Sequence, residues 1–412
     1  MSERSNALQA LLQWGAKARS RYGFAYLDAN GTPLPSQGIQ LWITCRMTHC
    51  FALAAKRHGA NASEYRELAT HGIACLNGVF HDERFGGYYS ALDFHTGQPL
   101  GEGQKEGYAH AFVLLAAASA VGANIAGGEQ LLHAASADFH AHWFDGTWVH
   151  ERYTRTWDHS EPYRGVNCAM HSVEAALAVG AITGDEVWLE IAEQLTTAVV
   201  GELAPTYCWR IPEHLDTTGE VQLDFNRENP ADPFRPYGAT PGHWWEWARL
   251  TWHLLAQADD RIDASKRWRL ATNARELCVA AWREAWEVDG APGPIYTVDF
   301  AGTPIVRARM HWVVCEAYAA VHAGMQFADE LAPRLTAGVT FGERGTWEQW
   351  ARTIAAYAHR YLIVRPGVWH HELDHHNQPA STCWVGRPDI YHAFQALILP
   401  TTALATPLAV AT

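Results

Sequence analysis

The sequence lacks the segments that usually join separate domains. It has no run rich in Pro, Gly or Ser, no block of like charges and no low-complexity tract. A chain of 412 residues could form two or three average domains or one large closed architecture. Without a linker, we expect one catalytic domain over residues 1–400. Residues 401–412 show no helical pattern and are expected to form a loose C-terminal tail.

Positive charge and long apolar runs are also scarce. The 31 Lys and Arg stand against 44 Asp and Glu, and the net charge of −13 argues against nucleic acid or an anionic membrane as a partner. No apolar run approaches the length of a membrane span, and the first residues have no apolar signal core. The 8 cysteines form no CxxC pair, which favours a reduced, cytoplasmic protein. Whether the chain forms a homo-oligomer is left open.

Motifs for bound cofactors are missing as well. The chain has no P-loop, no GxGxxG after a strand and no GxSxG. His371-Glu-Leu-Asp-His375 matches the HExxH pattern of zinc proteases, but Pro366-Gly367 and Asn377-Gln-Pro379 bracket it. Zinc protease chemistry needs that pattern on a helix, whereas here it falls in a stretch that reads as a strand. We therefore expect no metal and no other cofactor.

Helical periodicity is what the sequence does contain, with short β-like stretches in every second gap between helices. Residues 86–95 align with 367–376, and Val298-Asp-Phe-Ala-Gly-Thr-Pro echoes Leu92-Asp-Phe-His-Thr-Gly-Gln-Pro. The repeating unit is therefore a helix, a strand–turn–strand and a second helix. Helices are expected at 5–20, 38–58, 63–80, 106–122, 128–143, 167–183, 185–202, 241–258, 263–286, 310–327, 346–363 and 388–397. β stretches are expected at 86–95, 148–153, 209–216, 295–299 and 367–376.

Six such units give twelve helices, which is the number in an all-α (α/α)6 barrel with an inner and an outer ring. The segments 106–122 and 167–183 are apolar all round, as inner helices are. Each hairpin then precedes an inner helix. The short β-hairpins and the N-termini of the inner helices should therefore share one face, the face expected to carry the active site.

The segment that begins at Thr240 is the best candidate for a catalytic element. Thr240 is a natural N-cap, Pro241 suits the first helical position, and His243 follows in the first turn with Glu246 three residues on. The positive end of a helix disfavours imidazolium, so His243 should be neutral. We expect Glu246 to orient the other ring nitrogen and make His243 a general base. His171/Glu174 and His392/Gln395 repeat this spacing.

Histidines occur near the same end of almost every inner helix, which predicts a polar cavity at the barrel mouth. The ordinary alternative is a set of core histidines with satisfied hydrogen bonds. A glycoside hydrolase on this barrel would instead use paired acids, for which Glu246, Glu316 and Glu372 are the candidates. A non-catalytic sugar binder would need only the aromatic walls. Tryptophans expected to form those walls are Trp42, Trp244, Trp312, Trp369 and Trp384.

Several blocks of the sequence resemble the N-acylglucosamine 2-epimerase superfamily, and within it the branch of mannose isomerases and sulfoquinovose isomerases. They run nearly from end to end of the chain: Leu41-Trp-Ile-Thr-Cys-Arg46-Met, Gly107-Tyr-Ala-His110-Ala-Phe, Tyr163-Arg-Gly-Val-Asn167-Cys-Ala-Met-His171, Phe234-Arg235-Pro-Tyr-Gly, Thr240-Pro-Gly-His243-Trp-Trp-Glu246-Trp, Pro304-Ile-Val-Arg-Ala-Arg309 and Asp389-Ile-Tyr-His392.

The resemblance implies an (α/α)6 barrel and cofactor-free proton transfer between C1 and C2 of a sugar through a cis-enediol. It implies that His243 and His392 form the acid/base pair. Arg235 lies in a Pro-rich loop and is expected to overhang the pocket mouth. The residues expected to bind or orient the sugar are Arg46, His110, Asn167, His171, Arg235, Glu246, Trp312, His371 and Trp384.

Two positions depart from the sulfosugar branch. His311 stands where an arginine precedes the tryptophan, and His371 stands where a glutamine precedes Glu-Leu-Asp. These changes favour a neutral sugar, with D-mannose and D-fructose as the interconverted pair and lyxose and xylulose as further candidates. Arg235 is retained, so an anionic group at C6 stays open. A sugar 2-epimerase of the mannose/glucose or cellobiose type is the nearest alternative.

Overall fold

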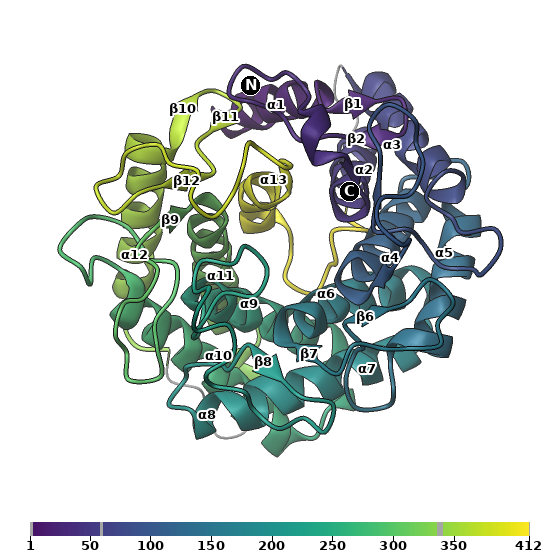
Figure 1. The fold of residues 1–412 in the computed structure, drawn as a ribbon. Helices are drawn as coiled ribbons and strands as arrows, with labels where there is room; N and C mark the ends of the chain where they lie inside the picture. The colour runs from purple at the N-terminus through teal and green to yellow at the C-terminus, as the bar shows by residue number, and fades with distance from the viewer. Residues whose placement is uncertain (1–2, 58–60, 336–340, 412) are drawn as a thin grey trace.

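The helices form two concentric rings around one axis (Figure 1). The computed structural model describes residues 3–57, 61–335 and 341–411, and this part contains twelve helices of eight or more residues. The inner ring is α2 (Leu41–Lys56), α4 (Gly107–Gly122), α6 (Val166–Thr183), α9 (Pro241–Ala258), α11 (His311–Glu330) and α13 (Tyr391–Ile398). The outer ring is α1 (Glu3–Ala16), α3 (Ala62–Asn77), α5 (Gly128–Asp138), α7 (Val187–Thr196), α10 (Ala264–Ala285) and α12 (Arg344–Tyr357).

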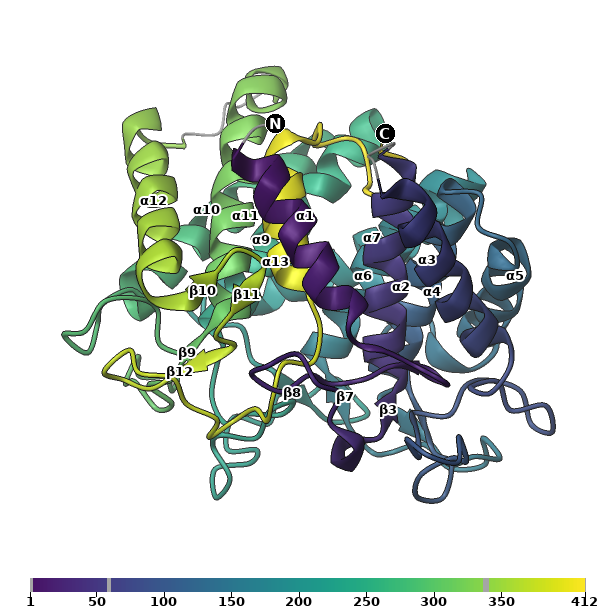
Figure 2. The ribbon, with the colours of Figure 1, turned by 90° about the horizontal axis from the view of Figure 1, so that it is seen from above.

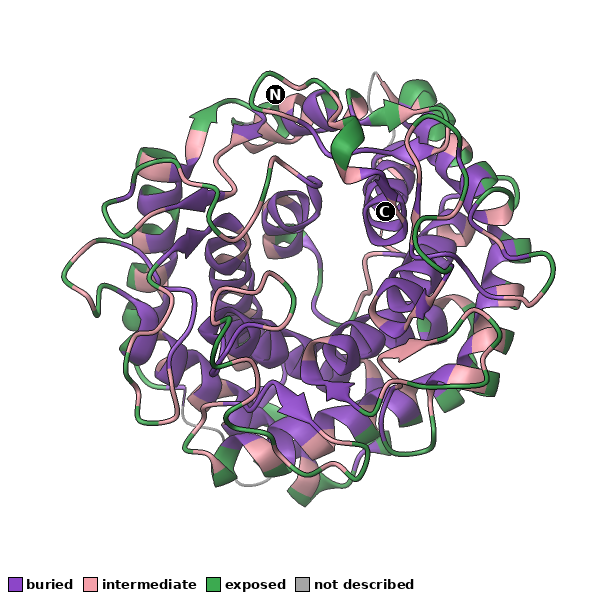
Figure 3. Cartoon of the chain, in the orientation of Figure 1, coloured by how far each residue is buried: buried purple, intermediate pink, exposed green. Residues whose placement is uncertain are grey.

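This arrangement confirms the predicted (α/α)6 barrel, and each expected helix is present, 241–258 with the expected ends and the others with shifted ends. The expected helix 38–58 ends at Lys56, and residue 58 lies outside the described residues. A three-residue helix, α8 (Ala204–Thr206), follows α7 and was not expected. Inner and outer helices differ in burial, as Figure 3 shows. The inner helix α9 buries 17 of its 18 residues, whereas the outer helix α10 buries 11 of 22.

The inner helix α6 corrects the expectation that no apolar segment approaches the length of a membrane span. Among the described residues, α6 alone is long and apolar enough to cross a membrane by length and composition. Its 18-residue window is 78% buried inside the structure, so α6 is a core helix of the barrel.

Short antiparallel strand pairs link each unit to the next around one end of the barrel. In each pair, one strand lies just before an inner helix and the other lies in the segment that follows the next outer helix. Ile39, before α2, pairs with Leu92, after α3. The pairs are β3 (Ile39–Gln40) with β4 (Ala91–Leu92), β5 (Lys105–Glu106) with β6 (Arg152–Tyr153), β7 (Arg164–Gly165) with β8 (His214–Leu215) and β9 (Arg309–Met310) with β12 (Glu372–Leu373). Single bridges join Ala239 to Val298 and Leu27 to Arg387, and the second of these closes the ring.

The predicted turn repeat has a physical basis in its aspartate. Asp93 Oδ1 accepts hydrogen bonds from the backbone N–H groups of His95 and Thr96. Asp299 and Asp374 accept equivalent bonds in the matching turns. Such a side chain closes a turn by replacing a backbone acceptor. The same turn occurs at Asp28 and Asp216, where the sequence comparison had not found it.

The strand pairs and the N-termini of the inner helices share one face, as predicted, and the C-terminal segment lies at the opposite end (Figure 2). The expectation of a loose tail is wrong for residues 401–411, and Thr412 lies outside the described residues. Leu404 and Ala409 are 0% and 1% exposed, and the Leu404 carbonyl accepts a 2.8 Å bond from His253 Nδ1. Burial of these apolar side chains stabilises the segment, because it covers the far end of the barrel and removes apolar surface from water.

Candidate active site

A cavity of about 660 Å³ lies among the first turns of the inner helices, on the strand-bearing face. Of the eleven site residues predicted from the sequence, nine line it: Arg46, Asn167, His171, His243, Glu246, Trp312, His371, Trp384 and His392. The structure therefore brings together residues from five inner helices and two loops into one space.

Aromatic rings form the outer wall of this cavity. The exposed ring of Phe234 lies with its centroid 5.1 Å from Trp384 and 5.8 Å from Trp42, and Tyr108 completes the group. Trp312 contributes a further wall. The prediction is wrong for Trp244, which is fully buried away from the cavity. It is also wrong for Trp369, which borders a separate apolar space between α11, α12 and α13.

His243 is oriented by a carboxylate that the sequence analysis missed. Its Nδ1 lies 3.0 Å from Oε2 of Glu213, a residue immediately before His214 of β8. The other oxygen of Glu213 accepts the backbone N–H of Thr240 at the start of α9. The expected pairing with Glu246 is wrong, because Glu246 lies one turn deeper in the barrel and binds Arg249 instead.

His392 is held in the same way by Glu316 of α11. The Nδ1 of His392 lies 2.8 Å from Glu316 Oε1, and Arg249 donates to Glu316 Oε2 at 2.9 Å. The expected partner, Gln395, donates to Glu174 instead. Both His392 and His243 contact the ring of Trp312, with centroids 5.8 and 5.1 Å away, so the two imidazoles flank one indole.

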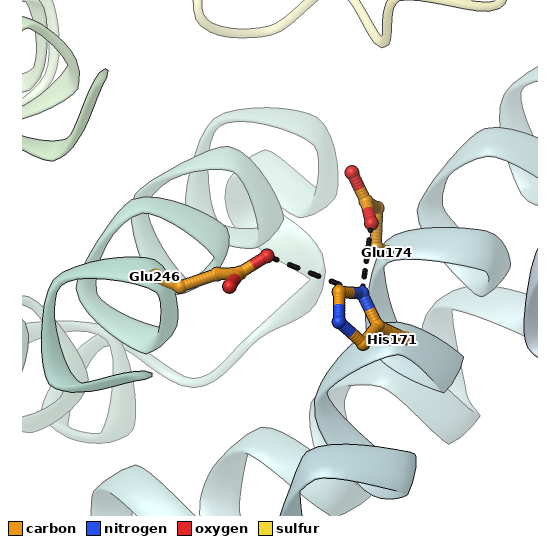
Figure 4. A group of neighbouring side chains, drawn as sticks. All are labelled: His171, Glu174 and Glu246. Carbon is orange, nitrogen blue, oxygen red and sulfur yellow. Dashed lines mark hydrogen bonds and ion pairs between the residues drawn. The ribbon is translucent and has the colours of Figure 1, made fainter. Parts of the chain in front are cut away.

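His171 forms the third pair, and here the predicted partner is correct. Its Nδ1 lies 3.2 Å from Glu174 Oε2 on the same helix, and Figure 4 shows the ring between Glu174 and Glu246. Glu174 also accepts hydrogen bonds from the Tyr391 hydroxyl and from Gln395 Nε2. Side chains from two inner helices thereby fix one imidazole.

These contacts define the chemistry of the three rings. A carboxylate accepts, so each Nδ1 carries the hydrogen and each Nε2 keeps its lone pair for the cavity. Burial lowers the pKa of His171 to about 4, despite the opposing effect of Glu174. Burial, with the positive charge of Arg46, holds the pKa of His392 well below its usual range. Both rings are therefore neutral bases near neutral pH.

Glu246 differs from the other carboxyl groups in the site. Arg249 donates to its Oε1 at 3.2 Å, but its Oε2 is buried and has no hydrogen-bond partner among the described residues. Burial and the neighbouring Glu316 carboxylate raise the pKa of Glu246 well above its usual range. Burial therefore favours the protonated form of Glu246 at the cavity floor, in which Oε2 can donate a proton.

Arg46 supplies the cation of this cavity. Its guanidinium donates to Asp389 at 3.2 Å and to the Tyr108 hydroxyl at 2.9 Å. It also lies 4.3 Å from the ring centroid of Phe112 and 4.6 Å from that of Tyr391. These contacts pre-orient a positive charge beside the catalytic candidates, where it can stabilise developing negative charge.

The HExxH sequence lies in a strand and turn, as its flanking residues predicted. Glu372 and Leu373 form β12, and the Glu372 carboxylate accepts the backbone N–H groups of Thr382, Cys383 and Trp384. His371 lines the cavity and stacks on His311, with ring centroids 3.8 Å apart. His375 is exposed beside His376. Of the two histidines of the pattern, one therefore faces the cavity and the other faces solvent.

Two predicted site residues lie outside the cavity. His110 is packed between Phe139 and Trp143, and its Nε2 bonds the Ala135 carbonyl at 2.9 Å. Tyr108 faces the cavity instead, and a residue two positions later is turned by about 200° around the helix. Arg235 donates to both oxygens of Glu161, at 2.6 and 2.8 Å, and does not reach the cavity lining.

Replacing Glu213 by glutamine should lower turnover by about 10- to 100-fold, part of the 10²–10⁴ that a positioned base contributes. The amide keeps the shape of the side chain but removes the negative charge that holds Nδ1–H of His243. The Michaelis constant should change little, which distinguishes a positioning role from a binding role. Glu161→Gln, outside the cavity, is the matched control and should keep its turnover. Equal turnover in the two variants would contradict the positioning role of Glu213.

Comparison with known proteins agrees with this geometry. Residues 23–396 match the N-acylglucosamine 2-epimerase (GlcNAc 2-epimerase) family. The chain belongs to this family. It is 43% identical to a D-mannose isomerase of Thermobifida fusca, over 94% of this chain and 90% of that protein. It is 39% identical to a D-mannose isomerase of Pseudomonas cannabina pv. alisalensis, over 97% of this chain and 92% of that one.

A crystal structure of a D-mannose isomerase has the same fold, with a TM-score of 0.81 and 23% sequence identity. The alignment covers 95% of this chain and 96% of the other. The resemblance seen in the sequence is therefore confirmed at the level of family and fold.

Proposed function

We propose that this chain is an aldose–ketose isomerase that interconverts D-mannose and D-fructose by moving a proton between C2 and C1. Two relatives that are 39% and 43% identical over most of the chain carry the name D-mannose isomerase. The observation that carries the proposal is the set of three histidine–carboxylate pairs around one cavity. In each pair the carboxylate holds Nδ1 of the histidine, so Nε2 is free to act on the substrate.

The proposed reaction uses these groups in order. In the open-chain sugar, Nε2 of His243 or His392 removes the proton from C2, and a cis-enediolate forms with its negative charge on O1. The imidazolium formed in this step returns a proton to C1, the other imidazole takes the proton of the C2 hydroxyl and gives it to O1, and the ketose results. Arg46 stabilises the negative oxygen that develops between the two steps. No step needs a metal or an organic cofactor.

The charge distribution in the cavity supports a neutral sugar as substrate. Among the described lining residues, Arg46 is the one with a permanent positive charge, and Asp389 is its partner at 3.2 Å. Arg235, the candidate for binding an anionic group, is paired with Glu161. Burial lowers the pKa of His311 to about 4 and, more strongly, that of His371, so both are neutral hydrogen-bonding groups.

There are two alternative functions, and the structure argues against the first of them. A glycoside hydrolase needs two carboxyl groups placed on opposite sides of a glycosidic bond. Here Glu316 supports His392, and Glu372 is occupied by backbone N–H groups. A 2-epimerase would use the same histidines from opposite faces of C2. Identifying the product distinguishes the two reactions, because isomerisation of mannose gives fructose and epimerisation gives glucose.

We also propose a cytoplasmic location, since all 8 cysteines are free and six of them are buried. The net charge of −13 supports neither a nucleic acid nor an anionic membrane as a partner. A small sugar is the proposed ligand, and a homo-oligomer is left open.

A single incubation tests the proposal. Mannose is incubated with the enzyme in deuterated water containing EDTA, and the products are followed by NMR. We expect fructose that carries deuterium at C1, with a rate unchanged by the chelator. Glucose deuterated at C2 would indicate a 2-epimerase instead. Activity that is lost in EDTA and restored by a divalent metal would contradict this metal-free mechanism.

A further inference from the structure

The side chain of Arg249 lies one turn deeper in α9 than Glu246, is 2% exposed and does not line the cavity. It therefore cannot touch a substrate. We propose that Arg249 is a positioning residue: its charge keeps Glu316 ionised, and Glu316 thereby holds His392 in the form whose Nε2 is a free base. This inference rests on the proposed function, because it treats His392 as a catalytic group.

The first argument is that Arg249 is bonded directly to the carboxylate that orients His392. Its Nε donates to Glu316 Oε2 at 2.9 Å, and a terminal nitrogen donates to Glu246 Oε1 at 3.2 Å. Glu316 is fully buried, and its other oxygen lies 2.8 Å from Nδ1 of His392. One chain of hydrogen bonds therefore runs from Arg249 through Glu316 to an imidazole of the cavity.

The second argument concerns charge. The charged and titratable groups that face Glu316 from the neighbouring helices are Arg249, Glu246 and His253 of α9, His171 and Glu174 of α6, and His392 of α13. Burial raises the pKa of Glu316, and the positive charge of Arg249 is the largest effect that lowers it. The other guanidinium of the site, Arg46, is paired with Asp389. Without Arg249, Glu316 and His392 would together keep one more proton.

That extra proton would remove the base, whichever of the two groups carries it. A protonated Glu316 donates to Nδ1 of His392, and the neutral ring then carries its own hydrogen on Nε2. An ionised Glu316 beside an imidazolium leaves a hydrogen on both ring nitrogens. In either case Nε2 has no lone pair for the sugar.

The other imidazole of the proposed pair does not depend on an arginine in this way. His243 is held by Glu213, which forms no ion pair with an arginine or lysine among the described residues. Loss of the Arg249 charge should therefore disable His392 and spare His243.

The test compares Arg249→Gln, which removes the charge but keeps a hydrogen-bond donor, with Arg249→Lys, which keeps the charge. At pH 7 we expect Arg249→Gln to turn mannose over about 100-fold or more slowly, and to recover as the pH rises to about 9, because alkali removes the extra proton. Its Michaelis constant should change little. Arg249→Lys should keep the pH profile of the wild type. Arg267→Gln changes a buried arginine of the outer helix α10, paired with Asp260, and is the matched control, expected to keep the wild-type turnover and pH profile.

A second measurement does not depend on activity. Nitrogen NMR of isotope-labelled histidine distinguishes a ring with hydrogen on Nδ1 from one with hydrogen on Nε2. The signals of His392 are identified by their absence from the His392→Asn variant. At pH 7 we expect His392 to carry hydrogen on Nδ1 alone in the wild type and in Arg249→Lys, and to carry hydrogen on Nε2 in Arg249→Gln.

The outcomes separate this inference from the isomerase proposal. A His392 ring that keeps hydrogen on Nδ1 alone in Arg249→Gln would overturn the inference, whether or not the enzyme makes fructose. The expected change of the ring in a protein that makes no fructose would sustain the role of Arg249 while the isomerase proposal fails. A loss of turnover in Arg249→Gln that is equal at every pH would indicate a structural role and would also overturn it. If Arg249→Gln does not fold, Arg249→Lys decides: hydrogen on Nε2 of His392 despite the retained charge would overturn the inference, and hydrogen on Nδ1 alone would support it.

Discussion

Replacing His243 or His392 with asparagine is expected to lower the turnover of mannose by about 100-fold or more, the scale of a positioned acid or base. Asparagine can still donate to Glu213 or Glu316 from the place of Nδ1, but it has no atom in place of Nε2. The loss should therefore appear in the rate at saturation rather than in the Michaelis constant. A steady-state comparison of both variants on mannose and on fructose measures it.

The two variants also distinguish the roles of the histidines. Deuterium exchange at C2 of mannose and at C1 of fructose reports the two proton transfers separately. If each histidine serves one carbon, each variant should lose one exchange more than the other. The control is His110→Asn, since His110 lies outside the cavity against the Ala135 carbonyl. Turnover within about threefold of the wild type in either active-site variant would refute that residue's role.

The protein should lose stability steeply as the pH falls from about 6.5 toward 4. Burial lowers the pKa of five fully buried histidines to about 4: His49, His110, His171, His253 and His311. An unfolded histidine titrates near 6.5, so below that pH the unfolded chain binds more protons than the folded one. The stabilisation is complete above pH 6.5 and is lost on the way to pH 4.

The expected size of this effect is large. At pH 5 each such histidine costs about 2 kcal/mol, and five cost about 10 kcal/mol, comparable with the whole stability of a typical domain. The raised pKa values of carboxyl groups such as Glu151, Glu246 and Glu316 act in the opposite direction and reduce the net slope. Melting curves between pH 8 and pH 4.5 measure the slope. His110→Phe should flatten it, and the exposed His375→Asn should leave it unchanged. A melting temperature that is constant from pH 7 to pH 5 would disprove this account.

The prediction of the fold succeeded because its signals are local. Period 3.6 apolar patterns identified the helices, and the repeated Leu-Asp turn identified the spacing of the units. Residues in the first turn of an inner helix must lie near the barrel mouth, so His171, His243 and His392 were found together. The same reasoning failed for His110, because a helix position fixes depth in the barrel but the face depends on rotation about the helix axis.

The sequence by itself determined the ring of twelve helices, the face that carries the cavity, and nine of the residues that line it. Only the tertiary structure decided which carboxyl group serves which histidine. Glu213 and His243 are 30 residues apart, and Glu316 and His392 are 76 apart. Such pairs form when the ring closes and brings neighbouring units together, so no local spacing encodes them. The closure of the far end of the barrel by residues 401–411 was decided in the same way, by burial of Leu404 and Ala409 against distant helices.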